Sequence, residues 1–533
     1  MLTLDEFTED KLESVEVSIA LSITSLDITR HPETIQLLGM LCLLPDGLNR
    51  WQERVDLIEQ EFESAASDIL LLRNFALIYT AGEKVGVLSP ICHFVLRLHP
   101  PKAEHTQCMY SIFWDLVDRY AMVSFGLDLR NAIDTLGPEI GNIKNLIEHA
   151  VRYYPSQRIL DIAIKMSWHL YVTNPSTDLL EKVSALVPMA APELQAEYWR
   201  ISGEIAHRQA RYVEATKNFT QAQVKFLEVD NRHQVAHCSL MLGDILRMQS
   251  RYAEATTMLT HARDHFLALD DPAGLARCIK GLGDVLAGKA KYTQASSMLT
   301  QARDGFLTIR DRLGAAQCLQ RLGEMLRMQS RYSGASAMLT EARDEFSKIG
   351  DHRGGAQCLQ GLGDVFYMQS KYPEASIMLT EARDRFLKMG ERLGAAKCLR
   401  SSADILIGQK LYDEAFSVLK QARAELLKIG DCLGAAYCLR SLGDVLGAQK
   451  RYSEALSTVI EALHQFQYIG DRFGEAQCLE SLGEFLVGQG QRTEGKTSLV
   501  RARNLFLEIG LENDAAECSE ILDGGGGNPG LQI

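Results

Sequence analysis

Residues 316–350 read AQCLQRLGEMLRMQSRYSGASAMLTEARDEFSKIG, and this stretch decides the fold. Apolar and small residues recur over 319–326 at the spacing of one helix face. Polar residues interrupt that spacing at 329–332, and it resumes over 335–346. The stretch therefore predicts two antiparallel helices joined by a short turn, which form a helix hairpin.

Residue size predicts how the hairpin packs. Gly323 and Ala335 are small, so we expect the two helices to approach closely there. Phe346 is large and lies near the end of the second helix, where we expect it to fill the gap to the next unit. Gly350 is expected to end that helix, because glycine adopts the left-handed cap conformation without steric cost.

The pattern repeats every forty residues from 211 to 530, without insertion or deletion. Such a period is typical of a solenoid, whose stacked units bury a core that no unit buries alone. Eight cysteines keep the period, and they are Cys238, Cys278, Cys318, Cys358, Cys398, Cys438, Cys478 and Cys518. Cysteines on successive units lie too far apart for disulfides, so we expect them to be reduced, buried packing residues.

Composition narrows the class of partner. The chain has 533 residues, of which 46% are hydrophobic, and a net charge of −13 at pH 7. This charge disfavours nucleic acid and anionic membrane and favours a basic or neutral protein. No apolar run reaches about 18 residues, and the acidic start MLTLDEFTED does not match a secretory signal. We therefore expect a cytoplasmic or nuclear location, and the absence of zinc-type Cys/His spacing predicts no metal or other cofactor.

A stripe on the first helix of each unit is the candidate site. The residue after the glycine position is acidic throughout: Glu204, Asp244, Asp284, Glu324, Asp364, Asp404, Asp444 and Glu484. The residues four positions earlier are Arg200, Leu240, Lys280, Gln320, Gln360, Arg400, Arg440 and Glu480. Both sets share one helix face, because residues four apart are one turn apart.

Two interpretations of this stripe remain open. Pairs such as Arg400 with Asp404 can be surface i,i+4 contacts worth about 0.2–0.5 kcal/mol. Alternatively, carboxylates of successive units bind the amides or the basic side chains of an extended peptide through charge-assisted hydrogen bonds. Catalysis is not expected, because no nucleophile, histidine partner or closed pocket accompanies the carboxylates.

The hairpin resembles the tetratricopeptide repeat. The residues that carry the resemblance are Leu322, Gly323, Tyr332, Ala335, Leu339 and Ala342, in a unit with a longer second helix. The resemblance implies an all-α, right-handed α-solenoid whose concave face, including the stripe, meets the ligand. The turn Ile469-Gly470-Asp471-Arg472 also resembles repeats of Pins-type adaptors, whose groove holds extended peptides.

The first 100 residues lack the period and are predicted to be helical over 15–28, 33–44 and 67–79. Segments 35–48 and 87–96 resemble the winged-helix subdomain of fungal NB-ARC ATPases that end in tetratricopeptide repeats, and 139–146 is similar to the helix that follows it. This resemblance implies a winged-helix-like helical head and the sensor or autoinhibitory arm of a NOD-like protein. His93 matches a nucleotide-contacting histidine of that family, although a packed histidine is the preferred interpretation.

The pattern GxxxxGK[ST] of a phosphate-binding loop is matched once, at 490–497, but there it falls on the turn and second helix of the last repeat instead of between a strand and a helix. This chain alone is therefore not expected to hydrolyse a nucleotide. We predict a winged-helix-like domain at 1–100, a helical linker with degenerate repeat helices at 101–196, the solenoid at 197–523 and a disordered glycine-rich tail at 524–533. The predicted function is non-enzymatic binding of a protein or extended peptide. A free-standing Pins-type adaptor, part of an NTP-dependent switch and self-association remain alternatives.

Overall fold

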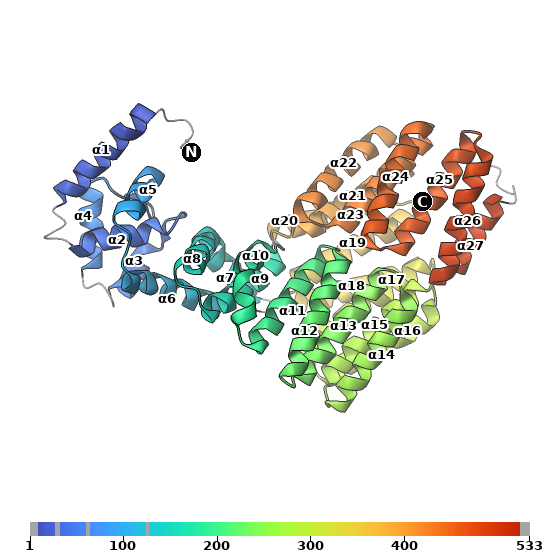
Figure 1. Ribbon diagram of the computed structural model, residues 1–533. Helices are drawn as coiled ribbons and strands as arrows, with labels where there is room; N and C mark the ends of the chain where they lie inside the picture. Colours follow the sequence, from blue (N-terminus) through green and yellow to red (C-terminus); the bar gives the residue numbers. More distant parts are fainter. Residues whose placement is uncertain (1–8, 27–31, 60–63, 124–126, 174, 523–533) are drawn as a thin grey trace. The chain divides into compact units, whose positions relative to one another are not determined.

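The computed structural model describes residues 9–26, 32–59, 64–123, 127–173 and 175–522. The predicted tail at 524–533 lies outside these residues. The chain divides into two compact units (Figure 1). Unit 1 comprises Met1–His169 and Asp178–Ala190, and unit 2 comprises Leu170–Thr177 and Ala191–Ile533.

The head of unit 1 combines helices with a small sheet. Its helices are α1 (Glu9–Ser25), α2 (Pro32–Cys42), α3 (Trp51–Ile58), α4 (Ala65–Asn74) and α5 (Ser89–Leu98). Strands β1 (Leu48–Asn49), β2 (Tyr79–Ala81) and β3 (Lys84–Gly86) form an antiparallel sheet in the order β1-β3-β2. The core of the head is apolar, with Leu37, Leu38 and Val85 fully buried.

The helix predicted at 67–79 is too long. It ends at Asn74, because Ala76 adopts a positive φ of 56° and the chain then enters β2. The packed role of His93 is also wrong, because the side chain is exposed on α5. The turn before β1 does form, with Gly47 at a φ of 70°.

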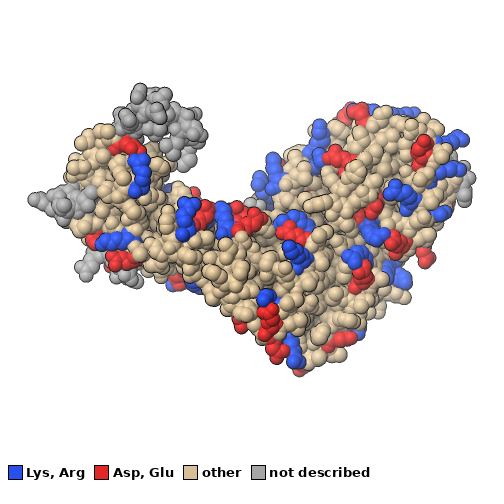
Figure 2. All heavy atoms as spheres, viewed as in Figure 1, with Lys and Arg blue, Asp and Glu red and all other residues tan. Residues whose placement is uncertain are grey.

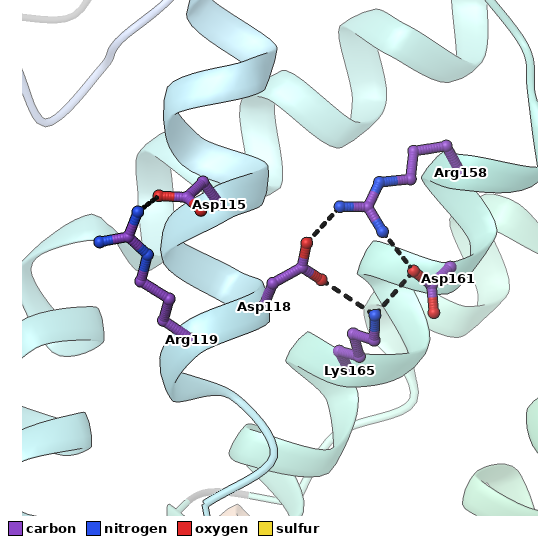
Figure 3. A network of polar contacts seen from close by, with 6 residues as sticks. All are labelled: Asp115, Asp118, Arg119, Arg158, Asp161 and Lys165. Atoms are coloured by element: carbon purple, nitrogen blue, oxygen red, sulfur yellow. Dashed lines mark hydrogen bonds and ion pairs between the residues drawn. The ribbon is translucent and has the colours of Figure 1, made fainter. Parts of the chain in front are cut away.

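The rest of unit 1 is helical. It comprises α6 (Ala103–Tyr120), α7 (Leu127–Leu136), η2 (Gly137–Glu139), α8 (Ile140–Tyr153), most of α9 (Gln157–Thr173), α10 (Asp178–Val183) and η3 (Ser184–Met189). Asp118 on α6 accepts hydrogen bonds from Arg158 and Lys165 on α9 (Figure 3). Asn142 donates to the Gly47 carbonyl at 2.8 Å and to the buried Glu139, which also pairs with Arg54 at 2.8 Å.

Unit 2 contains eight helix hairpins within its described residues. Their first helices are α11 (Pro192–Arg208), α13 (Arg232–Met248), α15 (Pro272–Gly288), α17 (Arg312–Met328), α19 (His352–Met368), α21 (Arg392–Gly408), α23 (Cys432–Ala448) and α25 (Arg472–Gly488). Their second helices are α12 (Tyr212–Glu228), α14 (Tyr252–Ala268), α16 (Tyr292–Thr308), α18 (Tyr332–Ile349), α20 (Tyr372–Lys388), α22 (Tyr412–Ile429), α24 (Tyr452–Ile469) and α26 (Arg492–Ile509). Helix α27 (Glu512–Leu522) packs on α26.

The packing follows residue size. A Cβ atom on Gly323 would lie 2.8 Å from Cγ of Leu339, so only glycine allows this approach of α17 and α18. Phe346 packs against Gly354 of the next unit, where a Cβ would lie 2.5 Å from the ring. Gly350 ends α18 with a φ of 81°. The predicted all-α solenoid of helix hairpins is therefore confirmed.

The periodic cysteines are buried as predicted. All eight have no exposed surface, and each is a free thiol. Burial raises the pKa of thiols such as Cys318 and Cys358 to about 12, so they are protonated at neutral pH. Within the described part of the chain, no helix is long and apolar enough to cross a membrane.

Candidate functional site

The first helices line the inner side of the solenoid. Each first helix packs on the second helix of its own hairpin. Consecutive first helices also contact one another, for example α13 with α15 and α23 with α25. In a curved stack, the elements on the concave side lie closest together. The stripe residues are on these helices. On the face shown in Figure 2, acidic and basic side chains are interspersed over the surface.

At the N-terminal end of the stripe, carboxylates are buried or paired. Glu204 is buried, which raises its pKa, while Arg200 pairs with Glu197 at 2.6 Å. Asp244 contacts Arg247 at 2.7 Å and His207 of the preceding unit at 3.3 Å. Burial alone would raise the pKa of Asp244, but Arg247 and His207 lower it below its usual value.

In the middle of the stripe, one arginine connects two units. Arg321 on α17 pairs with Asp284 on α15 at 2.8 Å and also with Glu324 of its own helix. Gln320 donates to Glu324 at 3.3 Å, and Lys280 donates to Gln317 of the next unit at 3.1 Å. The contacts here therefore run between units as well as within one helix.

Further along, the expected i,i+4 pairs are present but long. Arg400 lies 3.9 Å from Asp404, and Arg440 lies 3.4 Å from Asp444. Asp444 also accepts a hydrogen bond from Ser481 of the next unit at 3.0 Å. Burial raises the pKa of Asp404 to about 6 despite the nearby Arg400.

Asp364 and Gln360 lie on α19, between these two regions. Burial raises the pKa of Asp364, although Arg327, Arg400 and a hydrogen bond from Ser401 of the next unit lower it. Gln360 is half-buried on the same helix. Asp364 is therefore a further carboxylate with a partner on the following first helix.

The C-terminal end of the stripe is acidic. Burial, together with the neighbouring Glu484, Glu517 and Asp514, raises the pKa of Glu480 to about 7. Burial also raises the pKa of Glu484, with Asp444 and Glu517 adding to the effect. The thiol of Cys518 donates to Glu480 at 3.6 Å. Negative charge therefore accumulates at the end of the array on α25 and α27.

Sequence reasoning found the i,i+4 pairs but missed three other cationic partners of the stripe, Arg321, His207 and Arg247. Arg321 lies three residues before an acidic position, and His207 and Arg247 lie three residues after one. A spacing of 37 residues separates His207 from Asp244 and Asp284 from Arg321, so a comparison at that spacing would have indicated both pairs between units. No group of three or more His, Cys, Asp or Glu residues that could hold a metal ion occurs among the described residues.

Comparison with known proteins identifies the repeat. Residues 315–388, which cover most of α17 to α20, match the tetratricopeptide repeat family model. A search of the curated proteins found no match.

Several solved structures are similar at low identity. A Rap protein complexed with competence and sporulation factor has 14% identity and a TM-score of 0.42, over 66% of this chain and 100% of that chain. A STAND protein with a tetratricopeptide repeat sensor from Pyrococcus horikoshii has 14% identity and a TM-score of 0.44, over 87% and 65%. The Rap conjugation gene regulator of plasmid pLS20, in complex with the Phr* peptide, has 14% identity and a TM-score of 0.45, over 67% and 96%.

Proposed function

We propose that the inner face of this tetratricopeptide repeat array binds an extended segment of a partner protein that carries basic side chains. The observation that carries the proposal is the unequal charge of the stripe. Arg247 neutralises a carboxylate in its N-terminal part and Arg321 does so in its middle part, whereas Glu480 and Glu484 have acidic neighbours. A bound segment therefore places its basic residues against α25 and α27.

The acidic end of the stripe, on α25 and α27, favours the binding of a cationic side chain. The raised pKa of Glu480 records the cost of holding a negative charge beside other carboxylates in a partly buried place. A lysine or arginine side chain would relieve this repulsion and form charge-assisted hydrogen bonds. Binding is therefore expected to strengthen as the pH rises through about 7, where Glu480 loses its proton.

The test is fluorescence polarisation with two labelled peptides of equal length, one alternating arginine with alanine and the other glutamate with alanine. We expect the basic peptide to bind and the double variant Glu480→Gln, Glu484→Gln to bind it about tenfold more weakly. The matched control is Glu374→Gln, Glu414→Gln, which removes the same charge from exposed positions on α20 and α22. Equal weakening in both double variants, or preference for the acidic peptide, would overturn the proposal.

For the whole chain, we propose the role of a sensor or autoinhibitory arm in a NOD-like, NTP-dependent switch. The resemblance of segments 35–48 and 87–96 supports this role, as does the order α2-β1-α3-α4-β2-β3, which suits a helical domain with a small sheet as its wing. Sequencing the full transcript tests it. An in-frame segment with a GxxxxGK[ST] loop upstream of residue 1 supports the switch, and a stop codon there favours an adaptor.

A further inference from the structure

Ser250 and Asp471 lie in turns of unit 2 that are buried, although the matching turns of the middle units are more open. Ser250, between α13 and α14, is 5% exposed, whereas Ser330 and Ser370 at the same repeat position are exposed. On the other side, Asp471 before α25 is 3% exposed, whereas Asp351 before α19 is only half-buried. Something other than the adjacent units must therefore cover these residues.

The turn at Ser250 and the turn at Asp471 contact each other. The hydroxyl of Ser250 lies close enough to the carboxylate of Asp471 to lower the pKa of that carboxyl group. A Cβ atom on Gly470 would lie 3.1 Å from Nε2 of Gln249, and one on Gly430 would lie 3.1 Å from Nε2 of Gln209. These glutamines are one repeat apart, and so are the glycines, so the same contact is made twice in register.

The contact continues toward the start of unit 2. Arg208 at the end of α11 pairs with Glu391, before α21, at 2.9 Å, and both side chains are about nine-tenths buried. Glu391 also lies 3.2 Å from Arg353, and the Arg208 guanidinium stacks over the ring of Tyr171 at 5.1 Å. We call this line of contacts, from Arg208–Glu391 to Ser250–Asp471, the seam.

Apolar packing supports the seam. One continuous hydrophobic cluster contains Tyr212 and Tyr252 together with Ile469 and Leu511, while the units between them form separate clusters. Tyr212 is 2% exposed, whereas Tyr332 at the same repeat position is half-buried. The superhelix has therefore completed a turn, and its first units rest on its last ones.

We propose that the seam holds the superhelix closed around its inner face and that it must open before an internal segment of a folded partner can enter. This inference rests on the proposed function and adds a step that regulates it. In a solenoid, stability comes from contacts between neighbouring units, so a contact between distant units can separate without unfolding any hairpin. The seam is such a contact, and its polar pairs are few.

Hydrogen exchange on the full chain tests whether the seam closes. Gln249→Glu places a carboxylate beside Asp471, and like charges at a buried contact repel. We expect the amides of 246–252 and of 467–473 to exchange together and about tenfold faster. The control is Gln329→Glu, because both glutamines lie in the sequence Arg-Met-Gln-Ser-Arg-Tyr and Ser330 is exposed.

A second variant covers the possibility that Gln249→Glu disturbs its own hairpin. Glu391→Gln removes the charge that pairs with Arg208 without adding one. It is expected to speed exchange over 204–211 as well as at its own turn, while circular dichroism stays unchanged. If neither variant alters exchange at the opposite side of the seam, the inference is overturned.

Entry is measured with the arginine–alanine segment placed as a loop between two folded carrier domains, which cannot thread through an open end. The loop is expected to associate about tenfold faster with Gln249→Glu than with wild type or Gln329→Glu. Equal association rates would overturn the gating step. Binding of the basic peptide to none of the proteins would count against the proposed function, whereas the exchange result would still decide whether the seam closes.

Discussion

Two turns of the solenoid have the same sequence and different surroundings. Residues 247–252 and 327–332 both read Arg-Met-Gln-Ser-Arg-Tyr, and both turns adopt the same backbone, with a φ of 58° at Ser250 and 56° at Ser330. In each, the tyrosine hydroxyl lies 3.4 Å from the serine hydroxyl. Only Ser250 is buried. Local sequence therefore sets the shape of the turn, and the position of the unit in the superhelix sets what covers it.

The largest effect on the free energy of unfolding is expected at a position where the hairpins α13–α14 and α17–α18 are alike. Ala255 and Ala335 are both fully buried between the helices of their hairpins. Replacing either by leucine overpacks the contact and is expected to cost about 1 to 3 kcal/mol of unfolding free energy. Hydrogen exchange should rise in the altered unit and its two neighbours, because solenoid units interact mainly with adjacent units.

The two alanine variants are expected to differ in hydrogen exchange across the seam. Ala255→Leu is also expected to speed exchange over 467–473, across the seam, whereas Ala335→Leu should leave that segment unchanged. A uniform rise along the whole array in either variant would contradict the nearest-neighbour description.

The two ends of the stripe are expected to respond to pH with opposite signs. The folded-state pKa of Glu480 is about 7, above its usual value, so its contribution to stability falls as the pH rises between about 4.5 and 7. Glu480→Gln should therefore stabilise the array at pH 8 by about 1 kcal/mol and have little effect near pH 4.5. Urea unfolding at the two pH values measures this.

Asp244 provides the opposite case. Its pKa is lowered in the folded state, so the stability it contributes is present above its usual value and is lost as the pH falls below about 4. Asp244→Asn should destabilise the array at pH 8 by about 1 kcal/mol, because Arg247 and His207 lose their partner. Shifts of the same sign for Glu480→Gln and Asp244→Asn at pH 8 would contradict the charge assignment.

The smallest effect comes from the two serines. Ser250→Ala removes a polar partner of the Asp471 carboxylate and is expected to cost about 0.5 kcal/mol. Ser330→Ala carries the same backbone strain and loses the same tyrosine contact, so it should change thermal stability by much less. Equal losses in the two variants would mean that the seam contributes nothing at this position.

Much of the solenoid follows from the sequence alone. The period, the short turn before Tyr332 and the left-handed cap at Gly350 depend on residues within one hairpin, so local pattern and backbone preference are sufficient to predict them. Burial of the cysteines follows as well, because the same helix face is covered in every unit. The head was less predictable. Its strands have only two or three residues each, which is too short for an alternating pattern to distinguish them from helix ends.

Only part of the candidate site could likewise be predicted from the sequence. The carboxylates of the stripe and their common face could be identified from spacing, but Arg321 reaches Asp284 only because two first helices lie side by side. The same holds for Asn142, whose bond to the Gly47 carbonyl joins residues far apart in unit 1. The sequence by itself determined the hairpin, because its information lies within forty residues. Only the tertiary structure decided which turns meet across the seam and which carboxylates find a cation, because those contacts depend on curvature accumulated over many units.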